Sequence, residues 1–307
     1  MQTEEKSGSF FYIVLASFFL FLSSWIFVYT TGINKLAVQS EDTVPAMFLP
    51  VAIIKEKTLY LNSYVDMMME RYPHPDDKNG VRGLTPFYLK KIGNNYASAF
   101  PIITPLVSLP VYFLPIKLGM EITWENLIIL SKISAALIMS LSGGFFYLLL
   151  KKQFSLDEEK SVKITMIYLF GSVNFAMLSQ SMWQHGTLQL FSILGLYFML
   201  DFLKSSNFKP FSAFFGGLFY GLAVLSRPTA GLALFFILLY MLFKIRYIKP
   251  FLKAMIPVAL GLLLNVAFFL WYNNEYYIGI QNQGYASQLF GSWISSFPEG
   301  FLGVWFS

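Results

Sequence analysis

Residues 9–30 read SFFYIVLASFFLFLSSWIFVYT, and residues 39–50, a short distance further on, read QSEDTVPAMFLP. The first stretch can cross a bilayer once, because a spanning helix needs about 20 mostly apolar residues. The second places two acids, Glu41 and Asp42, just beyond the membrane exit and follows them with two prolines. Carboxylates close to a bilayer are costly, so they usually have a function there. The alternative is that the pair forms the first solvated residues after a helix, or caps the next one.

The composition indicates an integral membrane protein. Of the 307 residues, 56% are hydrophobic and 13% are charged, whereas soluble domains carry about 25% charged residues. The net charge of +5 is scattered, and no basic run indicates nucleic-acid binding. With no cysteine, the chain has no disulfide, zinc–thiolate site or cysteine nucleophile. No small-residue cleavage site follows the first apolar stretch, so we interpret it as a retained anchor.

We predict an all-α integral membrane protein: a polytopic bundle of about eight apolar segments, with one large extracytoplasmic loop after the first helix. That loop, residues 31–98, mixes charges with aromatics and is expected to fold with interfacial helices. Residues 100–119 carry four prolines, which argue against one straight helix and favour a bent or re-entrant hairpin. The other helices are expected at residues 9–30, 125–150, 162–179, 186–203, 210–226, 228–243 and 254–272.

The whole chain, residues 1–307, is interpreted as a single transmembrane domain. It stops inside an apolar run, so we expect it to be incomplete at the C-terminus. Lysines gather in the connections at residues 151–163, 204–209 and 244–253, which the positive-inside rule places in the cytoplasm. The turns between these connections should then face outward with the loop. Parity also requires that residues 100–119 do not make a simple crossing.

In this topology four polar features converge on the outer face. They are the pair Glu41 and Asp42, the approach from Lys90 and Lys91 to Ser98, the turn Trp183, Gln184 and His185, and Arg227. Adjacent residues on an extended segment point opposite ways, so only one acid of the pair should face the site. Arg227 has no acidic neighbour in sequence and needs a partner or an anion. Phosphate suits it, because the guanidinium fork binds phosphate bidentately; alternatively, Arg227 snorkels to lipid headgroups.

His185 and Trp183 stand at a predicted helix start, where an imidazole could bond a sugar hydroxyl and an indole could stack on a sugar face. The alternative is that both are ordinary interfacial residues. No glycine-rich phosphate loop is present, so an ATPase or a Rossmann-type nucleotide-sugar enzyme is unsupported. Glu41, Asp42 and His185 could together supply the ligands of a divalent metal.

These motifs resemble the GT-C superfamily of polytopic glycosyltransferases, closest to bacterial enzymes similar to protein O-mannosyltransferases and aminoarabinose transferases. The resemblance covers essentially the whole chain through short motifs, at residues 41–45, 96–112 and 222–229. It implies a polyprenyl-phosphate sugar as donor and Asp42 as general base. It also implies that Arg227, Lys90 and Lys91 bind the donor phosphate. Glu41, Ser98, Trp183, Gln184 and His185 would contact donor or acceptor, and no cofactor is firmly implied.

We therefore predict a membrane glycosyltransferase that acts on a glycan, lipid or protein acceptor at the extracytoplasmic face of a prokaryotic cell membrane. It would move the sugar to a hydroxyl or an amine. A transporter or flippase for a lipid-linked or anionic substrate is the main alternative; inverted repeats would be expected for it, and none is visible. A non-catalytic scaffold is disfavoured by the polar residues concentrated on one face.

Overall fold

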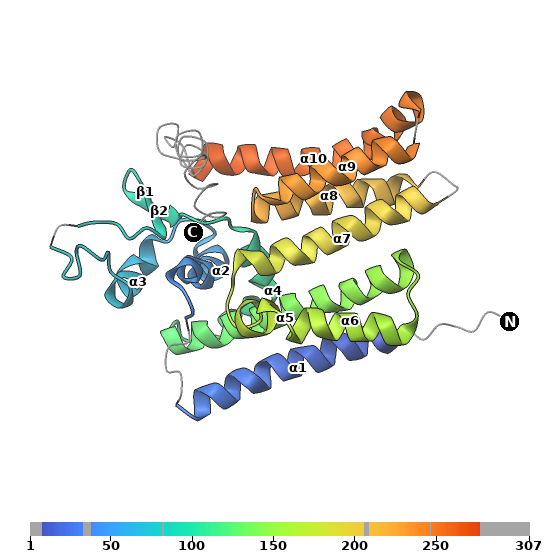
Figure 1. Cartoon of the computed structure of the whole chain (residues 1–307). Helices are drawn as coiled ribbons and strands as arrows, with labels where there is room; N and C mark the ends of the chain where they lie inside the picture. Colours follow the sequence, from blue (N-terminus) through green and yellow to red (C-terminus); the bar gives the residue numbers. More distant parts are fainter. Residues whose placement is uncertain (1–7, 33–37, 82, 206–208, 246, 277–307) are drawn as a thin grey trace, which may run out of the picture.

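The computed structural model describes residues 8–32, 38–81, 83–205, 209–245 and 247–276, and these residues are mostly helical. The long helices lie roughly side by side in one bundle (Figure 1). They are α1 (Gly8–Thr30), α5 (Trp124–Leu148), α6 (Glu158–Phe170), α7 (Gln184–Lys204), α8 (Pro210–Ser226), α9 (Ala230–Ile245) and α10 (Ile248–Tyr276). In space α1 packs on α5, α5 on α7, α7 on α8 and α8 on α10, with α6 beside α5. The predicted all-α membrane architecture is confirmed.

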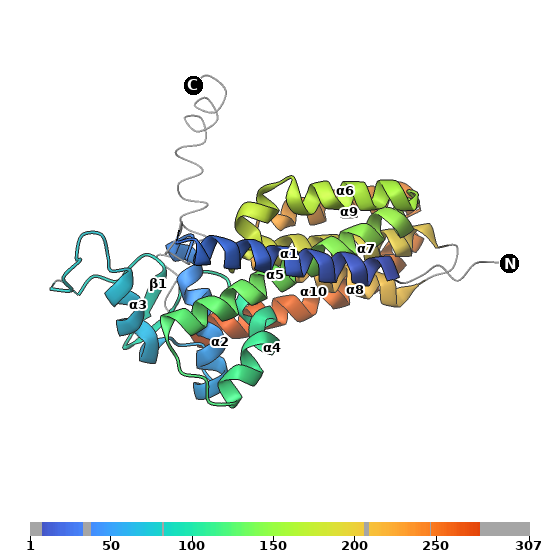
Figure 2. The ribbon, with the colours of Figure 1, turned by 90° about the horizontal axis from the view of Figure 1, so that it is seen from below.

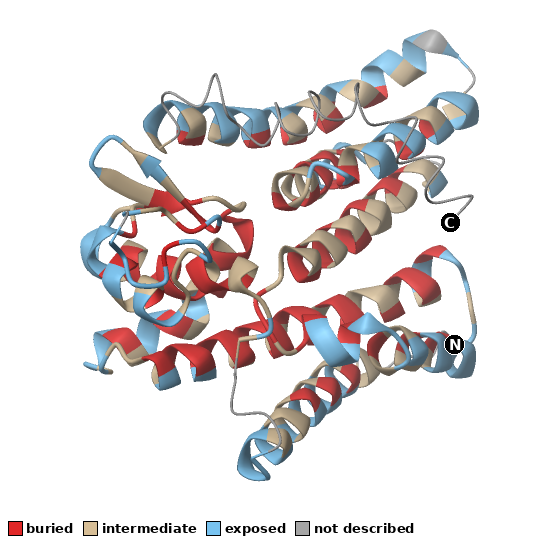
Figure 3. Cartoon of the chain, turned by 60° about the vertical axis from the view of Figure 1, so that its left-hand side comes forward, coloured by how far each residue is buried: buried red, intermediate tan, exposed pale blue. Residues whose placement is uncertain are grey.

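By length and composition, four helical stretches of the described residues can cross a membrane. They are Gly8–Thr30, Trp124–Gln153, Gln184–Lys204 and Lys249–Tyr276. The second stretch continues α5 through a π-helical turn, η3 (Leu149–Gln153). The apolar helices at Ile103–Lys117, Pro210–Ser226 and Ala230–Ile245 are shorter. Large apolar side chains are exposed along α1, α9 and α10, as expected for helices that face lipid. Figure 3 colours exposed residues pale blue.

Helices α8 and α10 approach closely at two glycines. A Cβ atom on Gly217 would lie 2.2 Å from the carbonyl oxygen of Val258, and one on Gly261 would lie 2.2 Å from that of Phe214. Small residues allow membrane helices to pack with their backbones in contact, where dispersion rather than the hydrophobic effect stabilises the pair. These glycines therefore set the spacing between α8 and α10.

The expected hairpin at residues 100–119 is wrong. Residues Ile103–Lys117 form a single helix, α4, with Pro110 and Pro115 inside it, and α4 runs obliquely to the bundle (Figure 2). Pro105 lies in the first turn, where a backbone N–H needs no helical partner. The other two prolines each remove a hydrogen bond, which membrane helices tolerate when neighbouring elements pack around them; α4 packs on α2, α5 and α7.

The predicted helix at residues 162–179 is also two elements. Helix α6 ends at Phe170, and Gly171 and Ser172 separate it from a π-helical turn, η4 (Asn174–Leu178). The side chain of Asn174 bonds back to the carbonyl oxygen of Tyr168 at 2.8 Å, which stabilises the break. This break shapes the connection on which the acidic turn docks.

Residues 38–98 form a small unit at one end of the bundle (Figure 1). Its elements are η1 (Glu41–Thr43), α2 (Val44–Glu56), η2 (Asn62–Tyr64), α3 (Val65–Arg71) and the antiparallel hairpin of β1 (Leu89–Ile92) and β2 (Asn95–Ser98). It shares a hydrophobic core with α4 and the start of α5, where Phe48 meets the Trp124 ring edge to face at 5.2 Å.

The opposite end of the bundle holds the start of α1 and the connections from α5 to α6, from α7 to α8 and from α9 to α10 (Figure 1). These are the connections in which the lysines gather. The bundle therefore has one end at which the lysine-rich connections between its helices gather and one end that carries the folded unit and the candidate site, where Lys90 and Lys91 of the hairpin also lie. Residues 277–307, on which the expected C-terminal incompleteness rests, lie outside the described residues.

Candidate active site

The segment that carries the acidic pair is held against the connection between α6 and α7. The side-chain amide of Gln39 donates to the carbonyl oxygen of Ala176 at 2.9 Å, and its oxygen accepts from Trp183 Nε1 at 3.0 Å. Further along, Ser181 Oγ donates to Thr43 Oγ1 at 3.1 Å. Contacts on both sides of Glu41 and Asp42 thus fix them to residues about 140 positions later in the chain.

Glu41 and Asp42 belong to the helical turn η1 and are half-buried. The backbone N–H of Asp42 donates to Ser40 Oγ at 3.3 Å, and Thr43 Oγ1 donates to the Ser40 carbonyl at 2.8 Å. The segment is therefore not extended as expected, but side chains on a turn of three residues still point about 120° apart. Burial, and after it the charge of Glu41, raises the pKa of the Tyr88 phenol. The Glu41 carboxylate therefore lies near enough to the buried Tyr88 for its charge to act on the phenol.

Arg227 and His185 lie against each other where α7 begins and α8 ends. Arg227 Nη1 bonds His185 Nε2, and it lies 3.4 Å from Nδ1 of the same ring. Both side chains are half-buried. Within the part of the chain that the structure describes, no carboxylate forms an ion pair with Arg227. A neutral imidazole orients the guanidinium without neutralising it, so Arg227 keeps its charge and its other N–H groups for a ligand.

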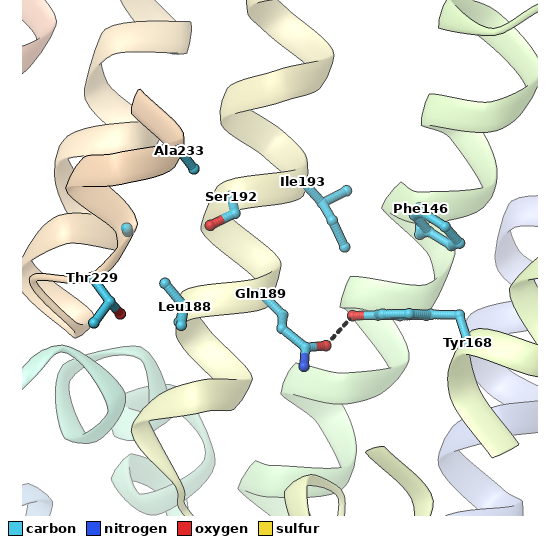
Figure 4. Close-up of a pocket in the computed structure, with 9 residues that line it drawn as sticks. Phe146, Tyr168, Leu188, Gln189, Ser192, Ile193, Thr229 and Ala233 are labelled. Carbon is cyan, nitrogen blue, oxygen red and sulfur yellow. Dashed lines mark hydrogen bonds between the residues drawn. The ribbon is translucent and has the colours of Figure 1, made fainter. Parts of the chain in front are cut away.

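An open groove of about 380 Å³ runs along α7, and its first lining residue on that helix, Leu188, lies one turn after His185 (Figure 4). Its lining comes from α5, α6, α7, α9 and the turn before α9: Phe146, Tyr168, Leu188, Gln189, Ser192, Ile193, Thr229, Ala230 and Ala233. The four residues from α7 follow His185 at intervals of 3, 4, 7 and 8 and so share its face of the helix. Across the groove, Tyr168 donates to Gln189 Oε1 at 2.5 Å. The groove is mainly apolar, and the guanidinium lies close to one end.

The other predicted site residues lie elsewhere on the same end. Lys90 and Lys91 are neighbours on β1, so their side chains point to opposite faces of the hairpin. Burial lowers the pKa of Lys90, while Lys91 lies over the Tyr96 ring at 5.7 Å. Ser98 bonds the backbone of Phe100 and closes the turn into α4.

The hairpin bridges to Tyr60, whose hydroxyl donates to the Glu275 carbonyl of α10 at 3.2 Å. The lysines are therefore placed on the α10 side of this end. Gln184 is the first residue of α7, and its carbonyl accepts from Thr187 Oγ1 at 3.0 Å.

The sequence reasoning missed Lys132 and the docking residues Gln39, Thr43 and Ser181. Lys132 lies within α5 and is only 5% exposed. A charged residue inside an otherwise apolar segment was the signal that could have found it. The docking contacts carry no such signal, because they join uncharged residues far apart in the chain.

Among the residues that the structure describes, no group of three or more His, Cys, Asp or Glu is arranged to hold a metal ion. Glu41, Asp42 and His185 are therefore not brought together as metal ligands. His185 instead bonds Arg227.

Residues 105–272, more than half of the chain, match a family model described as dolichyl-phosphate-mannose-protein mannosyltransferase. The chain belongs to this family. It is a membrane glycosyltransferase of the GT-C type, and enzymes of this type take their sugar from a lipid-linked donor. Family membership favours an enzyme over the transporter alternative. No curated protein and no solved structure matches the chain.

The match includes Trp183, His185, Arg227 and the groove, and it begins after Asp42. The small unit at residues 38–98 also precedes it.

Proposed function

We propose that this glycosyltransferase moves a sugar from a polyprenyl-phosphate donor to an acceptor hydroxyl or amine on the extracytoplasmic face, with Asp42 as the general base. The observation that carries the proposal is the arrangement of one end of the bundle. There the acidic turn, the Trp183 indole and the His185–Arg227 pair are joined through the α6–α7 connection and the start of α7. The lysine-bearing connections lie at the other end (Figure 1), which by the positive-inside rule is cytoplasmic, in a prokaryote the inner side of the cell membrane.

The groove supports a lipid-linked donor. It is open, mainly apolar, and lies between helices at membrane depth, which suits an isoprenoid chain. Arg227 lies beside Thr229 and Ala230 at one end of it, where the phosphate of such a lipid would be placed. Lys90 and Lys91 would bind the donor phosphate together with Arg227, and Glu41, Ser98 and Gln184 would contact the donor or the acceptor.

In the proposed reaction Asp42 accepts the proton of the acceptor O–H or N–H group as that atom attacks the anomeric carbon. The bond from the anomeric carbon to the phosphate oxygen breaks, and its electron pair leaves with the lipid phosphate. General-base assistance contributes about 10²–10⁴-fold. Arg227 stabilises the charge that develops on the phosphate, and His185 holds the guanidinium in place beforehand, so little reorganisation is needed. The acceptor is a glycan, a lipid or a protein.

The test uses the purified full chain in lipid nanodiscs, a panel of polyprenyl-phosphate sugars, and delipidated cell-envelope material as the source of acceptor. Consumption of one donor is expected with the natural sequence. Asp42→Asn should lose at least about 100-fold of that activity. Glu41→Gln should remain within a few-fold, because neighbouring side chains on a turn of three residues point about 120° apart and only one of the pair can face the acceptor.

Transfer by Asp42→Asn at a rate close to the natural one would remove Asp42 from the role of base. The reverse pattern, an inactive Glu41→Gln with an active Asp42→Asn, would transfer the role to Glu41.

A further inference from the structure

The connection between α9 and α10 differs from the other lysine-rich connections of the bundle because it contains no acidic residue. Residues 244–253 hold four basic side chains, and the sequence has no Asp or Glu between Asp201 and Glu275. The connections from α5 to α6 and from α7 to α8, by contrast, neutralise lysines with acids of their own. The ion pairs there are Lys151–Glu158, Lys160–Asp157, Lys163–Glu159 and Lys209–Asp201.

Two cations stand on opposite sides of the tight turn that joins these helices. Helix α9 ends at Ile245 and α10 begins at Ile248, and between them the backbone N–H of Tyr247 donates to the Ile245 carbonyl at 2.7 Å. Lys244 precedes the turn and Lys249 follows it, and both side chains are exposed. Within the part of the chain that the structure describes, neither of them forms an ion pair. The turn lies at the end of the bundle opposite the small unit (Figure 1).

Helix stability does not account for the lysines that follow this turn. The N-terminal end of a helix carries a partial positive charge, so acids are favoured in its first turn and bases in its last. Lys249 is the second residue of α10, Lys253 lies one turn further on, and the first turn holds no acid. Only Lys244, in the last turn of α9, has a position that suits its charge. An anion from outside the chain would suit all three.

The exposed face of α10 next to the turn mixes these cations with apolar side chains. Lys249, Leu252, Lys253 and Ile256 follow one another at intervals of three, one and three residues and share one face of the helix. Leu252 is 57% exposed, Ile256 is 61% exposed, and Tyr247 in the turn is 74% exposed. Such a face is typical of the boundary between lipid headgroups and acyl chains, where apolar side chains enter the hydrocarbon and ammonium groups reach the phosphates. A water-soluble anion would account for the lysines but not for the apolar side chains between them.

We propose that the α9–α10 corner, formed by Lys244, Tyr247, Lys249 and Leu252, binds an anionic phospholipid of the leaflet that meets this end of the bundle. Lys244 and Lys249 hold its phosphate from the two sides of the turn, and Tyr247 and Leu252 contact its acyl chains. A lysine near an anionic membrane surface strengthens binding about fivefold. The proposal is independent of the proposed function, because the donor site lies at the other end of the bundle.

The test measures thermal unfolding of the purified full chain in neutral detergent micelles that contain increasing mole fractions of phosphatidylglycerol or phosphatidylcholine. A lipid that binds only the folded chain raises the unfolding temperature. Phosphatidylglycerol should do so at lower mole fractions than phosphatidylcholine. In the double variant Lys244→Gln with Lys249→Gln, the mole fraction for half of the effect should rise about 30-fold, from two factors of about five. Because both lysines are exposed, their replacement leaves the packing of the helices intact.

Two further variants separate the corner from general charge. Lys160→Gln with Lys163→Gln removes the same charge from the same end, but from lysines that are already ion-paired, and should behave like the natural sequence. Lys244→Arg with Lys249→Arg keeps the charge and should keep the affinity. An equal loss in the Lys160 and Lys163 variant would assign the effect to net charge and overturn the proposal.

The choice of lipid is tested in the same titrations. Equal stabilisation by phosphatidylcholine would show that the lysines do not select the headgroup, and equal stabilisation by inorganic phosphate would show that no lipid is needed; either result overturns the proposal. The KM for the sugar donor should be the same in Lys244→Gln with Lys249→Gln as in the natural sequence. A higher KM would assign the corner to the donor instead of to a separate phospholipid.

Discussion

The hydrogen bond between Ser181 and Thr43 provides a direct test of how the acidic turn is held. Ser181 donates to Thr43, and Thr43 donates to the Ser40 carbonyl at 2.8 Å. Thr43 is 1% exposed and Ser181 is 3% exposed, so water does not replace a lost partner. Thr43→Val removes the hydroxyl that joins Ser181 to Ser40. The Ser181 hydroxyl is then buried without a partner, which alone lowers the free energy of unfolding by about 1–3 kcal/mol.

The turn is expected to relieve that cost by shifting, and Asp42 shifts with it. A displacement of about 1 Å in a reacting group can cost 10²-fold in rate. We therefore expect the kcat of Thr43→Val to fall about 10- to 100-fold, with the KM for the lipid donor nearly unchanged because Arg227 and the groove are untouched. Ser181→Ala should lose only several-fold, since Thr43 keeps its bond to Ser40. Thr43→Ser preserves the hydroxyl and is the matched control.

The assay is steady-state transfer in nanodiscs at saturating acceptor, with thermal unfolding measured on the same preparations. A Thr43→Val protein that melts earlier but keeps its kcat within two-fold would refute the reasoning, because the bond would then stabilise the fold without positioning Asp42. Equal losses in Thr43→Ser and Thr43→Val would assign the effect to the methyl group rather than to the hydrogen bond.

Further predictions concern the groove end, the membrane face and the bundle. Arg227→Ala should raise the KM for the donor and lower kcat together, and Arg227→Lys should restore part of both; initial rates over a range of donor concentrations check this. In this cysteine-free chain, Thr229→Cys should react with a membrane-impermeant thiol reagent on intact cells, whereas Ser155→Cys at the other end should react only after lysis; the reverse would invert the topology. Gly217→Ala should lower unfolding stability by about 1–3 kcal/mol because its Cβ meets backbone at 2.2 Å, and Gly231→Ala, which meets nothing within 4 Å, should not.

Long apolar runs predicted the spanning helices well, because a helix that crosses the bilayer needs about 20 consecutive apolar residues and such a run is visible in the sequence. The helix expected at residues 186–203 is observed at Gln184–Lys204. The prediction failed at α4. Its prolines indicated a hairpin, whereas packing against α2, α5 and α7 stabilises a single helix. It failed again at α6, because the break after Phe170 depends on the bond from Asn174 back to Tyr168. Both errors came from tertiary contacts that a linear pattern does not contain.

At the site, the sequence predicted that His185 and Arg227 lie at the same end of the bundle. Each stands in a turn between two apolar segments, and the lysines lie in the turns at the other ends of those segments. It did not predict that they bond each other, because 42 positions separate them and neither forms an ion pair with any residue that the structure describes. The turn at Glu41 and Asp42 was identified from its charge beside a membrane exit. Its conformation was not, since an extended segment was expected and Ser40 instead caps a helical turn.

The family match and the structure together divide the proposed site into two halves. The bundle half contains Arg227, His185 and the groove, and it lies inside the matched residues 105–272. The other half, with Asp42, precedes the match and is joined to the bundle through Gln39 and Ser181 contacts. If the first half holds the lipid and the second brings the base, changes at the joint should lower transfer without lowering lipid binding. Changes at Arg227 should lower both, because a donor that is not held cannot be presented to Asp42.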